Sequence, residues 1–272
     1  MYMGGYTLNY VVFTDMDGTL IDHHTYSCEA ARPALDRLKK EGIPLIVCTS
    51  KTRAEIEKFR DELEISDPFI SENGAAIFIP KGYFKTSFNF DEELDDYLVI
   101  IQGTPYQKLR EVLKEIEASS GCKIRGFGDM TPQDISKDCG LDLESAELSK
   151  RRDFDEPFVI GDETRSLYIL KEIKNMGLNF TRGGRYYHIM GNSDKGQAVS
   201  ELIEIYRREL KNVTTIGLGD SLNDLPMLKS VDLPVLVKKP DGSYDSQINI
   251  EVMHAEGIGP VGWEKAIMEI LE

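Results

Sequence analysis

Short apolar runs alternate with amphipathic stretches along the first part of the chain, and this pattern indicates strands followed by helices. Tyr10–Thr14 is a β-branched and aromatic run, which predicts a buried strand. A helix is expected from Ser27 to about Lys40, ended by Gly42. The same reasoning predicts, in order, strand Pro44–Cys48, helix Thr52–Glu64, strand Phe69–Ser71, the turn Glu72–Gly74 and strand Ala76–Ile79. This alternation favours a parallel α/β sheet.

The pattern changes from about Tyr83 onward. The acidic segment Phe88–Asp96 is interpreted as a linker or surface loop. The elements predicted after it are strand Tyr97–Ile101, helix Pro105–Ala118, strand Lys123–Phe127, a broken helix from Thr131 to about Arg152, strand Phe158–Ile160, helix Glu163–Met176, and strands Asn179–Arg182 and Tyr186–Met190. This mixture predicts a small α+β domain with its own sheet.

After Gly191 the first pattern resumes. The elements predicted there are helix Lys195–Leu210, strand Thr214–Leu218, helix Asn223–Lys229, strand Leu233–Val237 and helix Trp263–Leu271. We therefore predict a Rossmann-like parallel-sheet α/β core formed by residues 1–85 and 190–272, with an α+β domain inserted at residues 86–189.

Composition narrows the choice of partners. The chain has 272 residues and a formal net charge of −15, so nucleic acid and anionic membranes are disfavoured as partners. The N-terminus lacks a signal-peptide pattern and the four cysteines form no C-x-x-C pair, which indicates a reduced, cytoplasmic protein. Any anionic substrate would need a locally basic pocket. The oligomeric state is not readable from the sequence.

Polar residues collect where the predicted parallel strands end, which is where an open α/β sheet places its ligand site. The first strand ends at Asp15-Met16-Asp17-Gly18-Thr19, and the second at Thr49-Ser50-Lys51. A later strand ends at Gly219-Asp220, followed by Ser221-Leu222-Asn223-Asp224, and Lys195 begins the helix before it. Polar residues at all four of these positions argue against a chance arrangement.

These residue types suit phosphoryl transfer. A carboxylate such as Asp15 can attack phosphorus, and Asp17 can protonate the leaving group and then deprotonate water. Lys195 would stabilise the developing negative charge, and Thr49 offers a hydroxyl and a backbone amide to the phosphoryl oxygens. Mg²⁺ prefers oxygen ligands, and the candidates are Asp15, Asp220, the nearby Asp224 and the Asp17 carbonyl.

These four groups of polar residues resemble the catalytic motifs of the haloacid-dehalogenase-like (HAD) phosphatases that carry a large α+β cap. The resemblance covers essentially the whole chain. It implies a nucleophile at Asp15, an acid/base at Asp17, a phosphate-binding hydroxyl at Thr49 or the adjacent Ser50, and a catalytic lysine at Lys195. It also implies Mg²⁺ as cofactor, with Asp15, Asp17, Asp220 and Asp224 at the metal.

Further segments resemble the mannosyl-3-phosphoglycerate phosphatases within that group. They are Thr49–Glu55, Ser71–Ala75, Arg182–Tyr186, Gly191–Gly196 and Gly259–Trp263. The resemblance implies a small anionic sugar phosphate as substrate, hydrolysed through an aspartyl-phosphate. Paired arginines suit a glycerate carboxylate. The candidate substrate-binding residues are Ser50, Lys51, Arg53, Glu72, Asn73, Gly74, Arg182, Gly183, Arg185 and His188.

Less specific interpretations remain for several of these residues. Lys51 and Arg53 are also compatible with solvated charges at a helix start, and Arg182 and Arg185 with an ordinary hairpin tip. His188 is equally compatible with a packed histidine. Gly257–Gly262 matches G-x-G-x-x-G, but the chain is too short beyond it for a dinucleotide unit, and Trp263 is expected to anchor the last helix.

Three functional alternatives also remain open at this point. A sugar phosphomutase would use the same aspartate but return the phosphoryl group to the sugar. A broad-specificity phosphatase would act on many esters at similar rates. A non-enzymatic binding protein would bind its ligand without magnesium-dependent turnover.

Overall fold

The computed structural model describes residues 9–183 and 185–272. The chain forms two compact units, which are described separately. Unit 1 comprises residues 1–49, 65–100 and 194–272, and unit 2 comprises residues 50–64 and 101–193. Unit 1 is therefore assembled from three separate stretches of sequence.

A sheet of nine strands organises the described part of unit 1, in the order β13-β12-β11-β1-β2-β3-β4-β6-β5. The strands from β13 to β3 pair in parallel, whereas β3 with β4 and β5 with β6 are antiparallel. Their bounds are β1 Asn9–Thr14, β2 Leu45–Cys48, β3 Phe69–Ser71, β4 Ala76–Pro80, β5 Glu92–Leu94, β6 Tyr97–Ile101, β11 Val213–Gly219, β12 Leu233–Lys238 and β13 Met253–Ile258.

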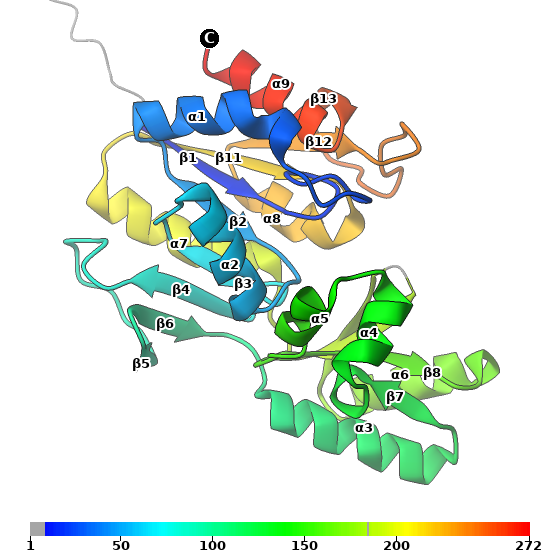
Figure 1. Cartoon of the computed structure of the whole chain (residues 1–272). Coiled ribbons are helices and arrows are strands. Elements are labelled where there is room, and N and C mark those ends of the chain that lie inside the picture. Colours follow the sequence, from blue (N-terminus) through cyan, green and yellow to red (C-terminus); the bar gives the residue numbers. More distant parts are fainter. Residues whose placement is uncertain (1–8, 184) are drawn as a thin grey trace, which may run out of the picture. The chain divides into compact units, whose positions relative to one another are not determined.

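Helices cover both faces of this sheet (Figure 1). On one face α7 packs over Val11 and Phe13 of β1, next to α8, and on the other face α1 lies beside α9. Because side chains alternate along a strand, Thr14 points to the α9 face. The bounds are η1 Glu29–Ala31, α1 Arg32–Glu41, α7 Lys195–Glu209, η4 Leu222–Asp224, α8 Leu225–Ser230 and α9 Pro260–Ile270.

Unit 2 is built on an antiparallel sheet in the order β7-β8-β10-β9. Helices α3 and α6 pack on the face that carries Tyr187 and Ile189, and α4 and α5 pack on the face that carries Tyr186. The bounds are α2 Arg53–Leu63, α3 Tyr106–Ser120, β7 Ile124–Gly126, η2 Phe127–Asp129, α4 Pro132–Cys139, α5 Leu143–Ser149, β8 Asp155–Ile160, η3 Glu163–Arg165, α6 Ser166–Asn175, β9 Asn179–Gly183 and β10 Tyr186–Met190.

Two strands differ from the sequence expectations. The segment Phe88–Asp96 is not wholly a loop, because Glu92–Leu94 forms β5 and pairs with β6 through a tight turn that holds Asp95 at φ 51°. This hairpin extends the sheet of unit 1, whereas β6 was expected in the insert. Strand β13 was not expected, because Met253–Ile258 is polar and largely exposed, and its pairing with β12 defines it.

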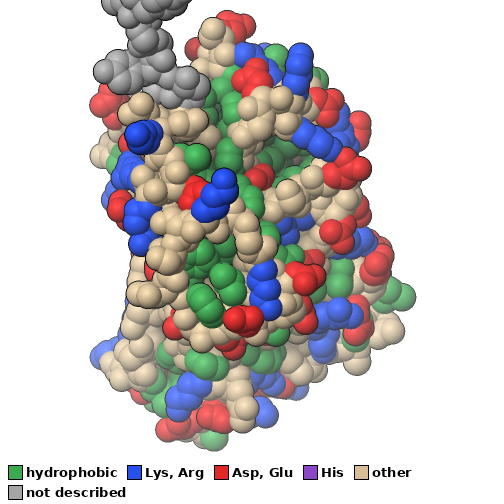
Figure 2. Space-filling model, turned by 90° about the vertical axis from the view of Figure 1, so that its left-hand side faces the viewer, with side chains coloured by type: hydrophobic (Ala, Val, Ile, Leu, Met, Phe, Trp, Pro, Cys, Tyr) green, Lys and Arg blue, Asp and Glu red, His purple; other side chains and the backbone are tan. Residues whose placement is uncertain are grey.

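The face drawn in Figure 2 is mixed in charge. Lys and Arg side chains are interspersed there with Asp and Glu side chains, so the excess of acid is not gathered in one patch on that face. Within the described residues, no helix combines the length and the apolar character that crossing a bilayer requires.

Candidate active site

A buried lysine between two aspartates forms the centre of the site in unit 1. Lys195 Nζ donates to Asp15 Oδ1 at 2.7 Å and to Asp224 Oδ1 at 2.6 Å. Lys195 is 1% exposed and Asp15 is 5% exposed. Burial alone would lower the pKa of Lys195, but the carboxylates of Asp15 and Asp224 outweigh it and raise that pKa, so the ammonium is retained.

Asp220 completes a group of three carboxylates. Asp15, Asp220 and Asp224 each offer an oxygen within 4.8 Å of the others. Burial, followed by the neighbouring Asp224, raises the pKa of Asp220 to about 6. Burial also raises the pKa of Asp15 well above its usual range, against the lowering effect of Lys195. Crowded hard oxygen donors of this kind fit a divalent cation such as Mg²⁺, which would relieve their repulsion.

Local sequence fixes the two later members of the site. The Asp194 side chain accepts from Gln197 N at 2.9 Å and caps α7, so the helix begins at Lys195. Asp224 Oδ2 accepts from the backbone N–H groups of Asp220 and Ser221, both at 3.1 Å. Asp224 therefore bonds Lys195 with one oxygen and shapes the Asp220 loop with the other.

The turn Glu72–Gly74 packs directly against the start of α7. All three residues have positive φ, at 46°, 59° and 92°, and Glu72 and Asn73 are buried. A Cβ on Gly74 would overlap the carbonyl of Asp194. Asn73 N–H donates to Thr49 O at 2.9 Å. The turn thus joins the end of β2 to the helix that carries Lys195, and only glycine fits at its third position.

Thr49 follows β2 and is fully buried. Its backbone N–H donates to Ile70 O at 3.2 Å. The expectation that this amide binds a phosphoryl oxygen is therefore wrong, because β2–β3 pairing uses it. In unit 2, Ser50 O accepts from Arg152 at 3.0 Å.

Asp17 and Gly18 form the turn after β1. Asp17 is half-buried and makes an isolated bridge with Ile21. Gly18 has φ 77°, and a Cβ there would lie 3.0 Å from Asp220 Oδ2. Glycine at this position therefore allows the β1 turn and the Asp220 loop to approach closely.

The basic residues expected to bind substrate have carboxylate neighbours in unit 2. Lys51, which precedes the helix, has its Nζ 3.7 Å from a carboxylate oxygen of Glu55, and Arg53 at the start of α2 has a guanidinium nitrogen 3.4 Å from a carboxylate oxygen of Glu57. The pairs favour the simpler interpretation of these two cations as helix-start charges, since part of their charge is neutralised locally.

The β9–β10 hairpin carries the other candidates. Arg182 is exposed and its guanidinium lies 4.8 Å from the Tyr187 ring centroid. Arg185 donates to Asp138 O at 3.0 Å. Gly183 ends β9, and its neighbour Gly184 lies outside the described residues.

His188 shares the Tyr186 face of β10. Its Nδ1 lies 2.9 Å from Oδ1 of Asp155, a fully buried carboxylate that also lies 3.6 Å from Arg152. Arg152 and Asp155 were missed by sequence reasoning, since no motif marks them.

A family model described as haloacid dehalogenase-like hydrolase matches residues 12–243, which include the whole centre described above. The chain belongs to the haloacid dehalogenase-like hydrolase family. The predicted family is thereby confirmed, and the centre of Asp15, Lys195, Asp220 and Asp224 occupies the carboxyl ends of the parallel strands in this family member.

Several named relatives of this HAD family member align over most of its length. The chain is 57% identical over 266 residues to a glucosyl-3-phosphoglycerate/mannosyl-3-phosphoglycerate phosphatase of Methanococcoides burtonii, with 97% of this chain and 98% of that protein covered. It is 40% identical over 227 residues to a mannosyl-3-phosphoglycerate phosphatase of Pyrococcus horikoshii, with 84% and 90% covered.

Solved structures confirm the predicted α/β fold with an inserted cap. A Thermoplasma acidophilum protein matches with a TM-score of 0.70 at 18% identity, covering 97% of this chain and 99% of that one. A HAD subclass IIB sugar phosphatase matches with a TM-score of 0.65 at 16% identity, covering 96% and 98%.

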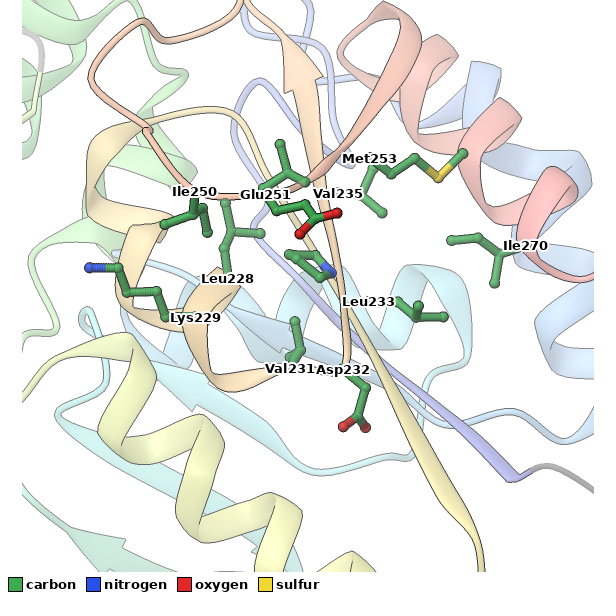
Figure 3. Close-up of a pocket in the computed structure, with 12 residues that line it drawn as sticks. Leu228, Lys229, Val231, Asp232, Leu233, Val235, Ile250, Glu251, Met253 and Ile270 are labelled. Atoms are coloured by element: carbon green, nitrogen blue, oxygen red, sulfur yellow. The ribbon is translucent and has the colours of Figure 1, made fainter.

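A separate groove of about 630 Å³ lies elsewhere in unit 1 of this HAD hydrolase (Figure 3). It is lined by Leu233 and Met253, the first residues of β12 and β13, together with Leu228 of α8 and Ile270 of α9. The groove therefore lies at the amino ends of the parallel strands, opposite the ends that carry Asp15 and Asp220, and it takes no part in the candidate site.

Proposed function

We propose that this HAD hydrolase is a Mg²⁺-dependent phosphatase that converts mannosyl-3-phosphoglycerate and glucosyl-3-phosphoglycerate to the glycosylglycerate and phosphate. The observation that carries the chemistry is the buried Asp15 carboxylate held 2.7 Å from Lys195. The substrate class is supported by the names of relatives that align with nearly the whole chain.

The reaction would proceed in two displacements. A carboxylate oxygen of Asp15 attacks phosphorus, and the bond from phosphorus to the glycerate oxygen breaks. Asp17 donates its proton to that leaving oxygen. Asp17 then takes a proton from water, which attacks the aspartyl-phosphate and releases phosphate and free Asp15. The proposed phosphate ligand is the Thr49 hydroxyl or that of the adjacent Ser50.

Lys195 and the metal have separate tasks in this scheme. The Lys195 ammonium orients Asp15 and offsets charge on the transferring group. Mg²⁺, when bound by Asp15 and Asp220 with the Asp17 carbonyl, would supply further positive charge to the phosphoryl oxygens. Asp224 would hold both Lys195 and the Asp220 loop in place, as its hydrogen bonds indicate.

Selection of the sugar and glycerate groups is proposed for the inserted residues 101–193 of unit 2 and for the turn Glu72–Gly74. Arg182 is one candidate for the glycerate carboxylate, because it is exposed and its guanidinium stacks on Tyr187. It is paired with Tyr187 across the hairpin and so lies on the opposite face of the sheet from His188. Arg185 and His188 are secondary candidates, since Asp138 and Asp155 contact them.

The test is phosphate release from four esters measured side by side with Mg²⁺: mannosyl-3-phosphoglycerate, glucosyl-3-phosphoglycerate, free 3-phosphoglycerate and mannose 6-phosphate. We expect strong preference for one or both glycosylated glycerates, and loss of all release after chelation. Equal slow release from all four would contradict the substrate assignment. Transfer of the phosphoryl group to a sugar without free phosphate would contradict hydrolysis.

A further inference from the structure

The glycine-rich segment Gly257–Gly262, which connects β13 to α9, has no role in the site described above. Its glycines are packed against the chain itself. A Cβ on Gly257 would lie 2.7 Å from Gly262 N, and one on Gly262 would lie 2.5 Å from Gly257 O. Gly259 has φ 52°, and its N–H donates to Lys238 O at 3.1 Å. The segment is therefore a close-packed connection that fixes where α9 begins.

Because the start of α9 is fixed, Trp263 packs against Thr14, the last residue of β1, which directly precedes Asp15. The Trp263 indole is fully buried, and its Nε1–H donates to Thr14 Oγ1 at 3.0 Å. The Thr14 hydroxyl, also fully buried, donates to Asp15 O at 2.7 Å. An indole N–H can only donate, so Thr14 must accept from it and direct its single proton to the Asp15 carbonyl.

This chain of hydrogen bonds acts on Asp15, the residue that follows β1. The Asp15 N–H donates to Leu218 O at 2.9 Å, as in the β1–β11 ladder. The Asp15 carbonyl accepts from the Thr14 hydroxyl. Both main-chain polar groups of Asp15 are thus occupied, while Lys195 holds the carboxylate from the other direction. The backbone from which the carboxylate projects is therefore fixed.

We propose that Trp263 and Thr14 are positioning residues that hold the Asp15 main chain, and through it the carboxylate, in line for attack on phosphorus. The inference rests on the proposed function of Asp15 as nucleophile. A nucleophile displaced by about 1 Å loses on the order of 100-fold in rate. A modest increase in the mobility of the Asp15 main chain therefore lowers kcat. We expect substrate affinity to change little, because Trp263 and Thr14 are both fully buried.

The test compares four variants with mannosyl-3-phosphoglycerate at saturating Mg²⁺. Thr14→Val removes the hydroxyl at nearly constant shape, Thr14→Ser retains it, and Trp263→Phe removes the indole donor. Thr215→Val is the matched control, because Thr215 is equally buried in neighbouring β11 but its hydroxyl bonds Asp232 at 2.8 Å. The chain has one tryptophan, so its indole ¹H–¹⁵N signal is unambiguous.

We expect Thr14→Val to lower kcat by roughly 10- to 100-fold with KM nearly unchanged, and to shift the indole signal. Thr14→Ser should recover most of the rate, Trp263→Phe should lower kcat in the same way, and Thr215→Val should leave kcat as in the wild type. The recovery by serine separates hydroxyl-dependent positioning from a loss of packing.

Three results would overturn the inference while leaving the proposed function intact. They are an indole signal that does not move in Thr14→Val, a moved signal with wild-type kcat, and an equal loss of kcat in Thr215→Val. A wild-type protein that releases no phosphate from any of the four esters would instead overturn the proposed function, and this inference with it.

Discussion

Lys195 and Asp224 form a fully buried ion pair, with Nζ 2.6 Å from Oδ1 and neither side chain exposed. Lys195 simultaneously contacts Asp15, so one cation serves two carboxylates. Pairs of this kind are costly to break, because the remaining charges stay buried without compensation. The site is therefore coupled to the stability of unit 1, and the effect of each substitution on folding has to be separated from its effect on catalysis.

Replacing Asp15 with asparagine should abolish turnover and leave the fold intact. The amide cannot form an acyl phosphate, so kcat should fall by at least about 10⁴-fold. The buried Lys195 ammonium would still pair with Asp224, so it keeps a carboxylate partner and the fold should survive. Phosphate release and the melting temperature are measured together. Near-normal turnover would exclude Asp15 as nucleophile.

Replacing Lys195 with methionine should destabilise the protein strongly. Asp15 and Asp224 would face each other without a cation, at a cost of about 3–5 kcal/mol. Lys58→Met is the matched control, since Lys58 pairs with Glu144 at 2.7 Å on the surface, and its loss should change stability by less than about 1 kcal/mol. Urea unfolding measures the loss of unfolding free energy in each variant. Equal losses would show that the burial of Lys195 does not make its ion pairs more costly to break.

Replacing Gly74 with alanine should impair folding and catalysis together. The new Cβ would overlap the Asp194 carbonyl and strain a residue at φ 92°, costing roughly 2–5 kcal/mol and displacing Lys195. Gly82 has φ 78° but open space around it. Gly82→Ala therefore measures the cost of placing alanine at a positive φ without a steric overlap. We expect Gly82→Ala to cost about 1–2 kcal/mol with full kcat. Matching losses in the two variants would refute the role of the turn.

Magnesium should stabilise the protein more at higher pH. Burial raises the pKa of Asp220 to about 6 in the metal-free protein, above its usual range. The stability contributed by its protonated form is complete below the unfolded pKa and is lost as pH rises through about 6. Mg²⁺ binds the ionised form, so the gain in melting temperature should be small near pH 5 and large near about pH 7.5. Asp220→Asn should weaken this dependence, and Asp15, whose pKa is also raised, would account for what remains. A gain independent of pH in the wild type would argue against Asp220 as a ligand.

Replacing Arg182 with alanine should weaken recognition of the glycerate carboxylate. Loss of a charge-assisted, two-bond contact corresponds to a KM about 10- to 100-fold higher for glycosylated phosphoglycerates. KM for mannose 6-phosphate, which has no carboxylate, should change little. Arg125→Ala is the control, because Arg125 pairs with Asp134 in a half-exposed contact of the same unit. An equal rise in KM for both substrates would indicate a general electrostatic effect.

Much of the site followed from chain order and strand geometry. The carboxyl ends of parallel strands converge, so Asp15 and Asp220 could be placed together from sequence, and Lys195 begins α7 as predicted. The pairing of Arg53 with Glu57, four residues later in α2, can also be predicted from helical spacing. These features depend on local periodicity or on a rule of topology.

The remaining features depend on contacts that no local pattern encodes. Arg185 meets Asp138 across 47 residues, and His188 meets Asp155 across 33. The amide of Thr49 was assigned to phosphate because the one-residue extension of the β2–β3 pairing cannot be read from sequence. Strand β13 has weak strand propensity and exists through its neighbour β12. Tertiary pairing decided each of these cases.

The division of unit 1 into three stretches has a consequence for the order of folding. Pairing of β1 with β11 joins Asn9 to Val213, a closure that is slow in an unstructured chain because the intervening loop is so long. Residues 101–193 are continuous and bring Thr104 against Gly191. If these residues fold first, their length hardly adds to the loop that β1 and β11 must close. Early folding of residues 101–193 would therefore shorten the loop that has to close before unit 1, which contains Asp15, can form its sheet.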